Sequence, residues 1–262
     1  MEPLQYALGG VSGVLVGFVL GLVGGGGSIL AVPLMVYLVG VPSAHVAIGT
    51  SAFAVAVNAA SGLASHARRG NVKWRCGAIY AAAGIAGALA GSTLGKMMDG
   101  ARLLFLFALV MVVVGALMLR RRGDAGNPGA ECNRSKLPKV LGFGLGSGVF
   151  SGFFGIGGGF LIVPGLIAAT DMPMLMAVGT SLVAVTAFGL TTAANYAVSG
   201  LVEWPLALVF IAGGIVGSQA GTRLASRLGR GKGALNTVFA VLIFVVAGYM
   251  IWRSAAAFLP AA

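Results

Sequence analysis

Residues 17–33 read GFVLGLVGGGGSILAVP and residues 148–164 read GVFSGFFGIGGGFLIVP, so one glycine-rich stretch occurs twice in the chain. The two stretches are 131 residues apart. After one deleted residue the match resumes, because GTS at residues 49–51 returns at residues 179–181. Matches that stay in register over this length indicate an internal duplication. We therefore predict that the chain consists of two copies of one unit.

Each copy contains five apolar segments separated by short polar loops. A polar stretch at residues 120–139, rich in glycine, separates the copies and is typical of a solvent-exposed linker. We expect a first transmembrane repeat over residues 1–119 and a second over residues 140–262. The predicted segments cover residues 4–23, 28–41, 44–66, 76–95 and 102–119 in the first copy and residues 140–155, 157–170, 174–197, 205–224 and 233–252 in the second.

The composition excludes a water-soluble fold. Hydrophobic residues make up 58% of the 262 residues and charged residues 9%, and the mean hydropathy is +0.98. A soluble domain of this size cannot bury so much apolar surface. Several segments approach the ~20 residues that a helix needs to cross ~30 Å of hydrocarbon, whereas barrel strands alternate in units of about 10 residues. The sequence therefore predicts an all-α integral membrane protein.

Lys and Arg outnumber Asp and Glu by 17 to 6, which gives a formal net charge of +11. These cations lie in short loops and not along one helical face, so they indicate membrane orientation and no binding to nucleic acid. Fourteen of the 17 fall in residues 67–75, 120–139 and 223–232. The positive-inside rule places these segments in the cytoplasm and both termini outside.

An odd number of membrane crossings in each copy follows from this charge distribution. Two copies with an odd number of crossings are inverted with respect to each other. The number of crossings stays odd whether the chain around each glycine cluster makes two full spans or a re-entrant hairpin, so both possibilities remain open.

The glycine clusters are expected to interrupt the helices. Residues 29–41 make only about 20 Å of helix at about 1.5 Å per residue, so this segment should begin inside the membrane as part of a broken or re-entrant helix. Backbone N–H groups freed at such a break, together with the positive end of the helix dipole, favour a small anion. We predict one central anion site between the two breaks, lined by Gly24, Gly25, Gly26, Gly27, Ser28, Gly155, Gly157, Gly158 and Gly159.

Other glycines recur at every fourth residue, which is the spacing of a helix-packing face. We predict packing, and no substrate contact, for four such rows. They are Gly13-Gly17-Gly21, Gly87-Gly91-Gly95, Gly144-Gly148-Gly152 and Gly213-Gly217-Gly221.

Small polar residues inside the third segment of each copy are further candidates for the anion site. Thr50 and Ser51 recur as Thr180 and Ser181, and Asn58 lies in the middle of its segment. Hydroxyl and amide donors can solvate an anion without holding it as tightly as a fixed charge. The same groups can instead bond between helices or back to their own helix, so both interpretations remain open.

The sequence contains no recognisable set of enzyme residues. It has no paired carboxylates, no nucleophile beside a base and no cysteines at metal-binding spacing, so we predict no catalytic residue, no metal and no other cofactor. Cys76 and Cys132 lie far apart in the sequence and are predicted to be reduced thiols. His45 and His66 lie at segment ends, where we expect interfacial positions.

The glycine-rich turn before Val-Pro, the GTS triplet and the G-x-V-x-W sequence together resemble the sulfite exporter TauE/SafE family, also called the toluenesulfonate uptake permeases. The resemblance covers both copies. The second cluster differs from the first, with Ile156 at the position of Gly25 and Gly159 at the position of Ser28. The resemblance implies a transporter of the bacterial inner membrane for a small sulfur-containing anion, such as sulfite, sulfoacetate or a related organosulfonate.

Export by alternating access is the expected mode, because an inside-negative membrane potential drives an anion outward without a coupled proton. A channel-like anion uniporter and a non-transporting membrane scaffold are the alternatives. The expected partners are the small anionic substrate and the lipid bilayer.

Overall fold

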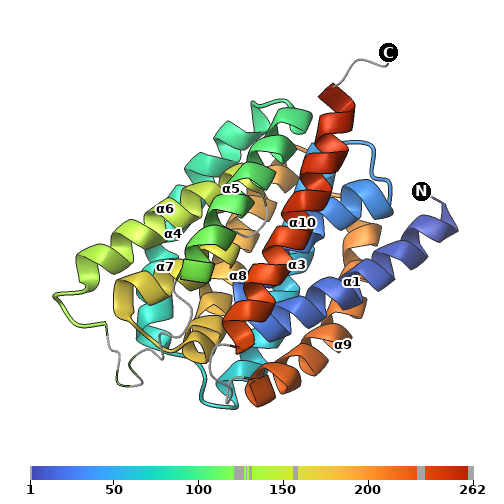
Figure 1. The fold of residues 1–262 in the computed structure, drawn as a ribbon. Coiled ribbons are helices and arrows are strands. Elements are labelled where there is room, and N and C mark those ends of the chain that lie inside the picture. The colour runs from blue at the N-terminus through green and yellow to red at the C-terminus, as the bar shows by residue number, and fades with distance from the viewer. Residues whose placement is uncertain are drawn as a thin grey trace.

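The computed structural model describes residues 2–120, 127, 129, 132–155, 159–228 and 234–258, and every regular element in these ranges is helical (Figure 1). Residues 121–126, 128, 130 and 131 of the predicted linker lie outside the described residues, as do the predicted site glycines Gly157 and Gly158. The longer helices are α1 (Pro3–Val23), α3 (Ala44–Ala67), α4 (Trp74–Lys96), α5 (Gly100–Arg120), α6 (Leu137–Phe154), α8 (Met174–Val198), α9 (Trp204–Leu228) and α10 (Ala234–Phe258).

Shorter helical pieces begin at the two glycine clusters. After α1 the chain continues as a 3-10 helix (Gly24–Leu30), the short α2 (Ala31–Pro33) and a π-helical turn (Leu34–Leu38). After α6 it continues as α7 (Gly159–Thr170).

Within the described ranges, six helical stretches are long and apolar enough to cross a membrane. This number agrees with a multi-pass membrane protein, and the predicted all-α class is confirmed for this part of the chain. The six stretches are Pro3–Leu38, Ala44–Ala67, Trp74–Lys96, Leu137–Phe154, Met174–Val198 and Trp204–Leu228.

The glycine rows bring α1 against α9 and α4 against α6. A Cβ built on Gly17 of α1 would overlap the carbonyl oxygen of Gly214 in α9, and one built on Gly148 of α6 would overlap the carbonyl oxygen of Gly84 in α4. The other members of the four predicted rows also face a backbone carbonyl of the opposite helix. These positions are therefore restricted to glycine by close helix packing, as predicted.

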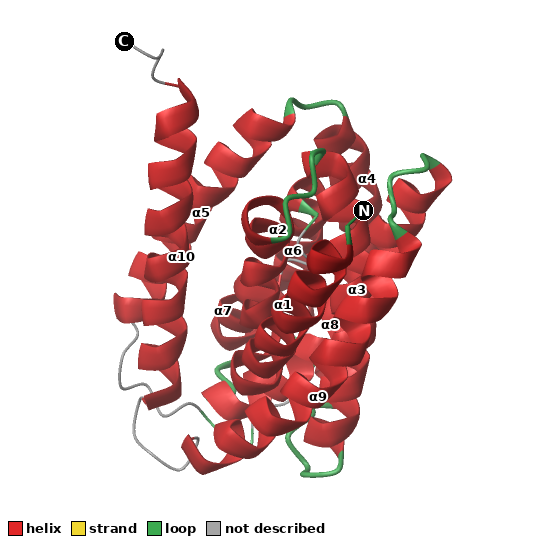
Figure 2. Ribbon diagram, turned by 90° about the vertical axis from the view of Figure 1, so that its right-hand side faces the viewer, coloured by secondary structure: helices red, strands yellow, loops and turns green. Residues whose placement is uncertain are grey.

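The helices α3 and α8 pack against each other, and each also contacts one of the glycine-rich pairs. α3 contacts α9, and α8 contacts α4. The helices α5 and α10 pair with each other at one side of the bundle (Figure 2). The centre of the bundle is therefore built by α3 and α8.

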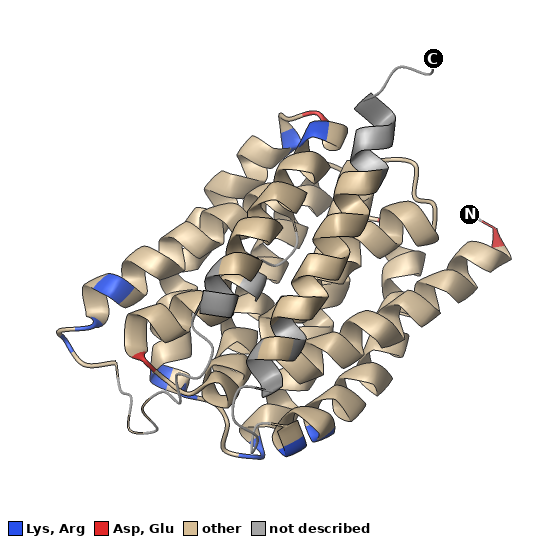
Figure 3. Ribbon diagram, in the orientation of Figure 1, with Lys and Arg blue, Asp and Glu red and all other residues tan. Residues whose placement is uncertain are grey.

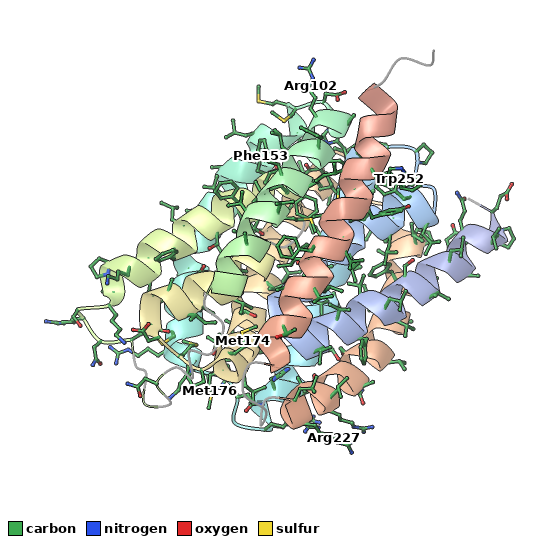
Figure 4. The ribbon with its side chains drawn as sticks, viewed as in Figure 1. Arg102, Phe153, Met174, Met176, Arg227 and Trp252 are labelled. Carbon is green, nitrogen blue, oxygen red and sulfur yellow. A yellow bond between two sulfur atoms is a disulfide. The ribbon has the colours of Figure 1, made fainter. Side chains whose placement is uncertain are left out.

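Most of the described Lys and Arg residues lie toward one end of the helix bundle (Figure 3). They come from the connection between α3 and α4, the beginning of α6 and the end of α9, and Arg227 marks this end in Figure 4. We call it the basic end. Arg102 lies at the opposite end (Figure 4), toward which α1 begins and α10 ends (Figure 1).

The prediction that the two cysteines are reduced thiols is wrong for this structure. Cys76 and Cys132 form a disulfide, with a Cα–Cα distance of 5.5 Å. The bond ties the first turn of α4 to the segment before α6. Sequence spacing missed it because the two cysteines are 56 residues apart and meet only where α4 packs along α6.

Candidate functional site

α1 ends where the first glycine cluster begins. Val23 is its last residue, and Gly24 has a φ of +65°, which L side chains rarely adopt. The chain then forms the 3-10 helix, in which Gly24, Gly25, Gly26, Gly27 and Ser28 are all buried. The α-helix is therefore interrupted inside the protein and not at its surface.

The first cluster packs against the beginning of α8. The N–H of Gly25 donates to Ser181 Oγ at 3.0 Å, and Ser181 donates in turn to the carbonyl of Val178 at 2.8 Å. A Cβ on Gly24 would lie 2.6 Å from the Val178 carbonyl oxygen. Within the cluster, Ser28 Oγ donates to the carbonyl of Gly25 at 2.8 Å. The structure thus brings Gly24, Gly25, Ser28 and Ser181 together.

The second cluster meets α3 in a related way. α6 ends at Phe154, Gly155 adopts a left-handed conformation with a φ of +67°, and α7 begins at Gly159. A Cβ on Gly155 would overlap the side chain of Ile48. The carbonyl of Ile48 accepts a hydrogen bond from Ser51 Oγ at 3.1 Å. Gly155 therefore packs against the turn of α3 that contains Ile48 and Ser51. In the same way, Gly24 packs against the turn of α8 that contains Val178 and Ser181.

The two predicted threonines bond to the backbone just before other helices. Thr50 Oγ1 accepts from the N–H of Glu203 at 2.9 Å, and Thr180 Oγ1 accepts from the N–H of Lys73 at 3.0 Å. These N–H groups directly precede α9 and α4, where helix geometry leaves donors without partners. Both threonine hydroxyls therefore hold the start of a helix, and no hydrogen bond among the described residues joins them to a glycine cluster.

Asn58 lies where three helices cross, and its side chain is fully buried. Its amide occupies the space that a Cβ would take on Gly214 of α9, and Gly17 of α1 packs against the same glycine. Neither Nδ2 nor Oδ1 has a hydrogen-bond partner within the described part of the chain. A buried polar group left without a partner costs about 1–3 kcal/mol. The amide therefore keeps hydrogen-bonding groups that no other described residue uses.

Aromatic side chains fill the corresponding place in the second repeat. Phe188, which aligns with Asn58, occupies the space beside Gly84 of α4 and stacks on Tyr80, with ring centroids 6.4 Å apart. The hydroxyl of Tyr80 hydrogen-bonds to Ser147 Oγ of α6. The two halves of the protein thus differ at this level, with a polar amide in one and packed rings in the other.

Sequence analysis missed three polar residues that bond to the central helices. Ser92 and Lys96 of α4 both bond to Asn195 of α8, and Ser218 of α9 lies 3.4 Å from Ser61 of α3, measured between the hydroxyl oxygens. The available signal was spacing, because Ser218 follows the packing glycine Gly214 by four residues and therefore shares its helix face.

His66 is not at the surface, as its position at a segment end suggested. It is fully buried, with Nε2 2.9 Å from the carbonyl oxygen of Gly21 in α1. His45 is half-buried, with Nε2 3.1 Å from the carbonyl oxygen of Met98. Within the described ranges, no group of three His, Cys, Asp or Glu side chains that could hold a metal ion occurs.

The sequence is similar to proteins named as membrane transporters. The protein-family model described as Sulfite exporter TauE/SafE matches residues 10–250. A probable membrane transporter protein of Xylella fastidiosa is 54% identical over 246 residues, which cover 93% of this chain and 94% of the relative. The probable membrane transporter protein YdhB of Bacillus subtilis is 28% identical over 215 residues, with 81% and 87% covered.

A third relative, a probable membrane transporter protein of Haemophilus influenzae, is 27% identical over 253 residues, with 90% of this chain and 94% of the relative covered. No solved structure matches the chain. The family match extends over both glycine clusters and all the central helices. This chain therefore belongs to the sulfite exporter TauE/SafE family of membrane transporters.

Proposed function

We propose that this protein is a secondary transporter that exports a small sulfur-containing anion, such as sulfite, sulfoacetate or a related organosulfonate, by alternating access. The observation that carries the proposal is the buried interruption after α1, where the Gly25 N–H is held by a hydroxyl of α8. Glycine lets a ligand approach the backbone closely, and backbone N–H groups at a helix break bind anions well.

In the proposed mechanism, Ser181 Oγ occupies the position that an anion oxygen takes when substrate is bound. The anion then accepts the hydrogen bond from Gly25 N–H, and the Ser181 hydroxyl turns from the Val178 carbonyl to donate to the anion. Gly26, Gly27 and Ser28 complete the first half of the site. Ser51 and the second cluster, Gly155 to Gly159, complete the other half.

Two repeats of opposite orientation, over residues 1–119 and 140–262, underlie this site in the proposal. Reciprocal contacts support the arrangement. Thr50 accepts from Glu203, while the corresponding Thr180 accepts from Lys73, which corresponds to Glu203. The pairing of α1 with α9 and of α6 with α4 is reciprocal in the same sense. Inverted repeats of this kind bind substrate between interrupted helices near the middle of the membrane.

The basic end faces the cytoplasm of a bacterial cell in this proposal, with the linker inside and both termini outside. The support is the charge distribution, since 14 of the 17 Lys and Arg lie in the three segments assigned to that side. A membrane potential of 100 mV, negative inside, then favours anion efflux by ~2.3 kcal/mol per charge. Export of this kind needs no coupled ion.

Flux measurements in proteoliposomes under an imposed potential test the proposal. Sulfite efflux should rise with an inside-negative potential and fall when the potential is reversed. The Ser181→Ala variant should transport roughly tenfold more slowly, because a hydrogen bond to a charged group contributes about 1.5 kcal/mol or more.

The matched control is Thr186→Val, which removes a hydroxyl of the same helix that donates to the carbonyl of Leu182, one turn earlier in that helix. This variant should transport normally. Flux that ignores the potential, or equal flux in both variants, would contradict the proposal. Single-channel currents too large for a conformational cycle would favour the channel-like alternative.

A further inference from the structure

Hydroxyl groups follow the interface between α3 and α9 from Asn58 toward the basic end. Ser61 of α3 and the fully buried Ser218 of α9 come first, with their hydroxyl oxygens 3.4 Å apart. Two turns further on, Arg69, just after α3, donates from Nη1 to Ser226 Oγ of α9 at 3.3 Å. We call this set of residues the inner lane.

A similar set follows the interface between α8 and α4 toward the opposite end. Asn195 of α8 donates from Nδ2 to Ser92 Oγ at 2.6 Å and to Thr93 Oγ1 at 3.1 Å, both on α4. Lys96 Nζ donates to Asn195 Oδ1 and to Ser199 Oγ, each at 2.9 Å. We call this set the outer lane.

The two lanes occupy corresponding places in the two repeats. Arg69 aligns with Ser199, and Lys96 aligns with Ser226, so each lane ends in one cation paired with one serine. The hydrogen bonds described above for the two lanes involve only Ser, Thr, Asn, Arg and Lys side chains. Several of these hydroxyls also donate to carbonyls of their own helices, as Ser218 does to Ile215 and Ser92 does to Leu89. A row of polar groups that leads to a terminal cation favours anions over cations.

The residues between the two lanes, Asn58 and Phe188, distinguish an anion route from simple helix packing. Asn195 is bonded to its neighbours on α4, as expected of a side chain that joins helices. Asn58 has no hydrogen-bond partner among the described residues, a property shared with Ser151 and Thr192, and it is the one of these three that carries an amide; it is fully buried and lies one turn from Ser61. On the other side, Phe188 stacked on Tyr80 takes the place of the amide, so the outer lane ends at packed aromatic rings.

We propose that the two lanes are the inner and outer halves of the route followed by the transported anion, that the Asn58 amide contacts the anion between them, and that Phe188 closes the outer half in the state described. This inference rests on the proposed transport of a sulfur-containing anion and adds a route and a gate to it. The glycine clusters hold the anion, and the lanes carry it to and from them.

Cysteine labelling tests the route. In protein carrying Cys76→Ser and Cys132→Ser, the single substitutions Ser61→Cys and Ser92→Cys place one thiol in each lane with little change in volume. The probe is sulfonatoethyl methanethiosulfonate, a small sulfonate. The cysteine thiolate attacks the sulfur that carries the sulfonatoethyl group, a mixed disulfide forms, and methanesulfinate leaves.

The matched controls are Val216→Cys on α9 and Leu89→Cys on α4, where the native side chains are 68% and 49% exposed on the outside of the bundle. Because only the thiolate reacts and lipid disfavours it, lane cysteines should react at least roughly tenfold faster than these controls. The inner-lane cysteine should react faster when the reagent is added at the basic end, and the outer-lane cysteine when it is added at the opposite end. Ethanesulfonate, which does not react with the probe, should slow both.

Charge gives a second readout. Lys96→Gln removes the cation of the outer lane, so the negative reagent should label Ser92→Cys more slowly, whereas the rate for a trimethylammonium analogue of equal size should not fall. Lys96→Arg keeps the charge and should leave both labelling rates nearly unchanged. If lane cysteines react no faster than the lipid-facing controls while the cysteine-free protein still transports sulfite, the route is wrong and the proposed function stands. If lane cysteines react and no sulfur anion crosses the membrane, the proposed function is wrong. The route is then wrong as well, because it depends on transport of the anion.

Discussion

Replacing Asn58 with leucine should make the protein more stable and, at the same time, inactive. Leucine has the same branched heavy-atom skeleton as asparagine and fills the space beside Gly214 with apolar atoms. The change removes two buried polar groups that have no partner among the described residues. At about 1 kcal/mol for each group, the gain is about 2 kcal/mol, which for a chain of this size raises the melting temperature by about 4–8 °C.

The matched control for this prediction is Asn195→Leu. Asn195 lies in α8 and donates to Ser92 and Thr93, and its side-chain oxygen accepts from Lys96. Removing it leaves those groups without their partner, so the melting temperature should fall by several degrees, at about 1–3 kcal/mol of lost stability. The same chemical change should therefore have opposite effects on stability at the two sites.

Thermal unfolding of the purified protein in detergent, followed by tryptophan fluorescence, provides the measurement, and sulfite flux in proteoliposomes provides the activity. A melting temperature that falls as far in Asn58→Leu as in Asn195→Leu would refute the reasoning, because the Asn58 amide would then be bonded within the protein. Full sulfite flux in Asn58→Leu would separately refute a contact between this amide and the anion.

Three further predictions concern the glycine faces, the gate and the disulfide. Gly148→Val should lower the melting temperature by several degrees, since overpacking costs about 1–3 kcal/mol, whereas Gly146→Val on the same helix should be neutral because nothing lies within 4 Å of its Cβ position. Phe188→Ala should open the outer lane and raise passive anion leak in proteoliposomes, and a leak equal to that of the native protein would contradict its role as a gate. Mass spectrometry of the protein after alkylation should detect no label on Cys76 or Cys132 without reductant and two labels after reduction.

The helical class and the interruption near Gly24 could be predicted from the sequence because both depend on local properties. The length of each apolar segment predicts a helix, and four successive glycines do not maintain a stable α-helix. The partner of the cluster depends instead on packing between distant segments. Ser181 is 156 residues from Gly25, and only the repeat placed it among the candidates.

The roles of the polar residues were harder to predict from the sequence, because the same hydroxyl can bond equally well to a ligand or to a backbone donor. Thr50 and Ser51 are adjacent, yet one bonds to the start of α9 and the other to its own helix at Ile48. Sequence cannot distinguish these partners, since they depend on which helix lies opposite. For the same reason, the disulfide between Cys76 and Cys132 was missed.

The packing of α1 against α9, a helix far away in the sequence, imposes an order on biosynthesis. The glycine face of α1 packs on a helix that the ribosome completes only after roughly 205 further residues, which takes about 10–41 s at about 5–20 residues per second. Until then, a newly inserted α1 has lipid or insertion machinery against its small residues in place of its native neighbour. A truncated product that ends before α9 should therefore be recognised as incomplete and degraded, however well its own helices insert.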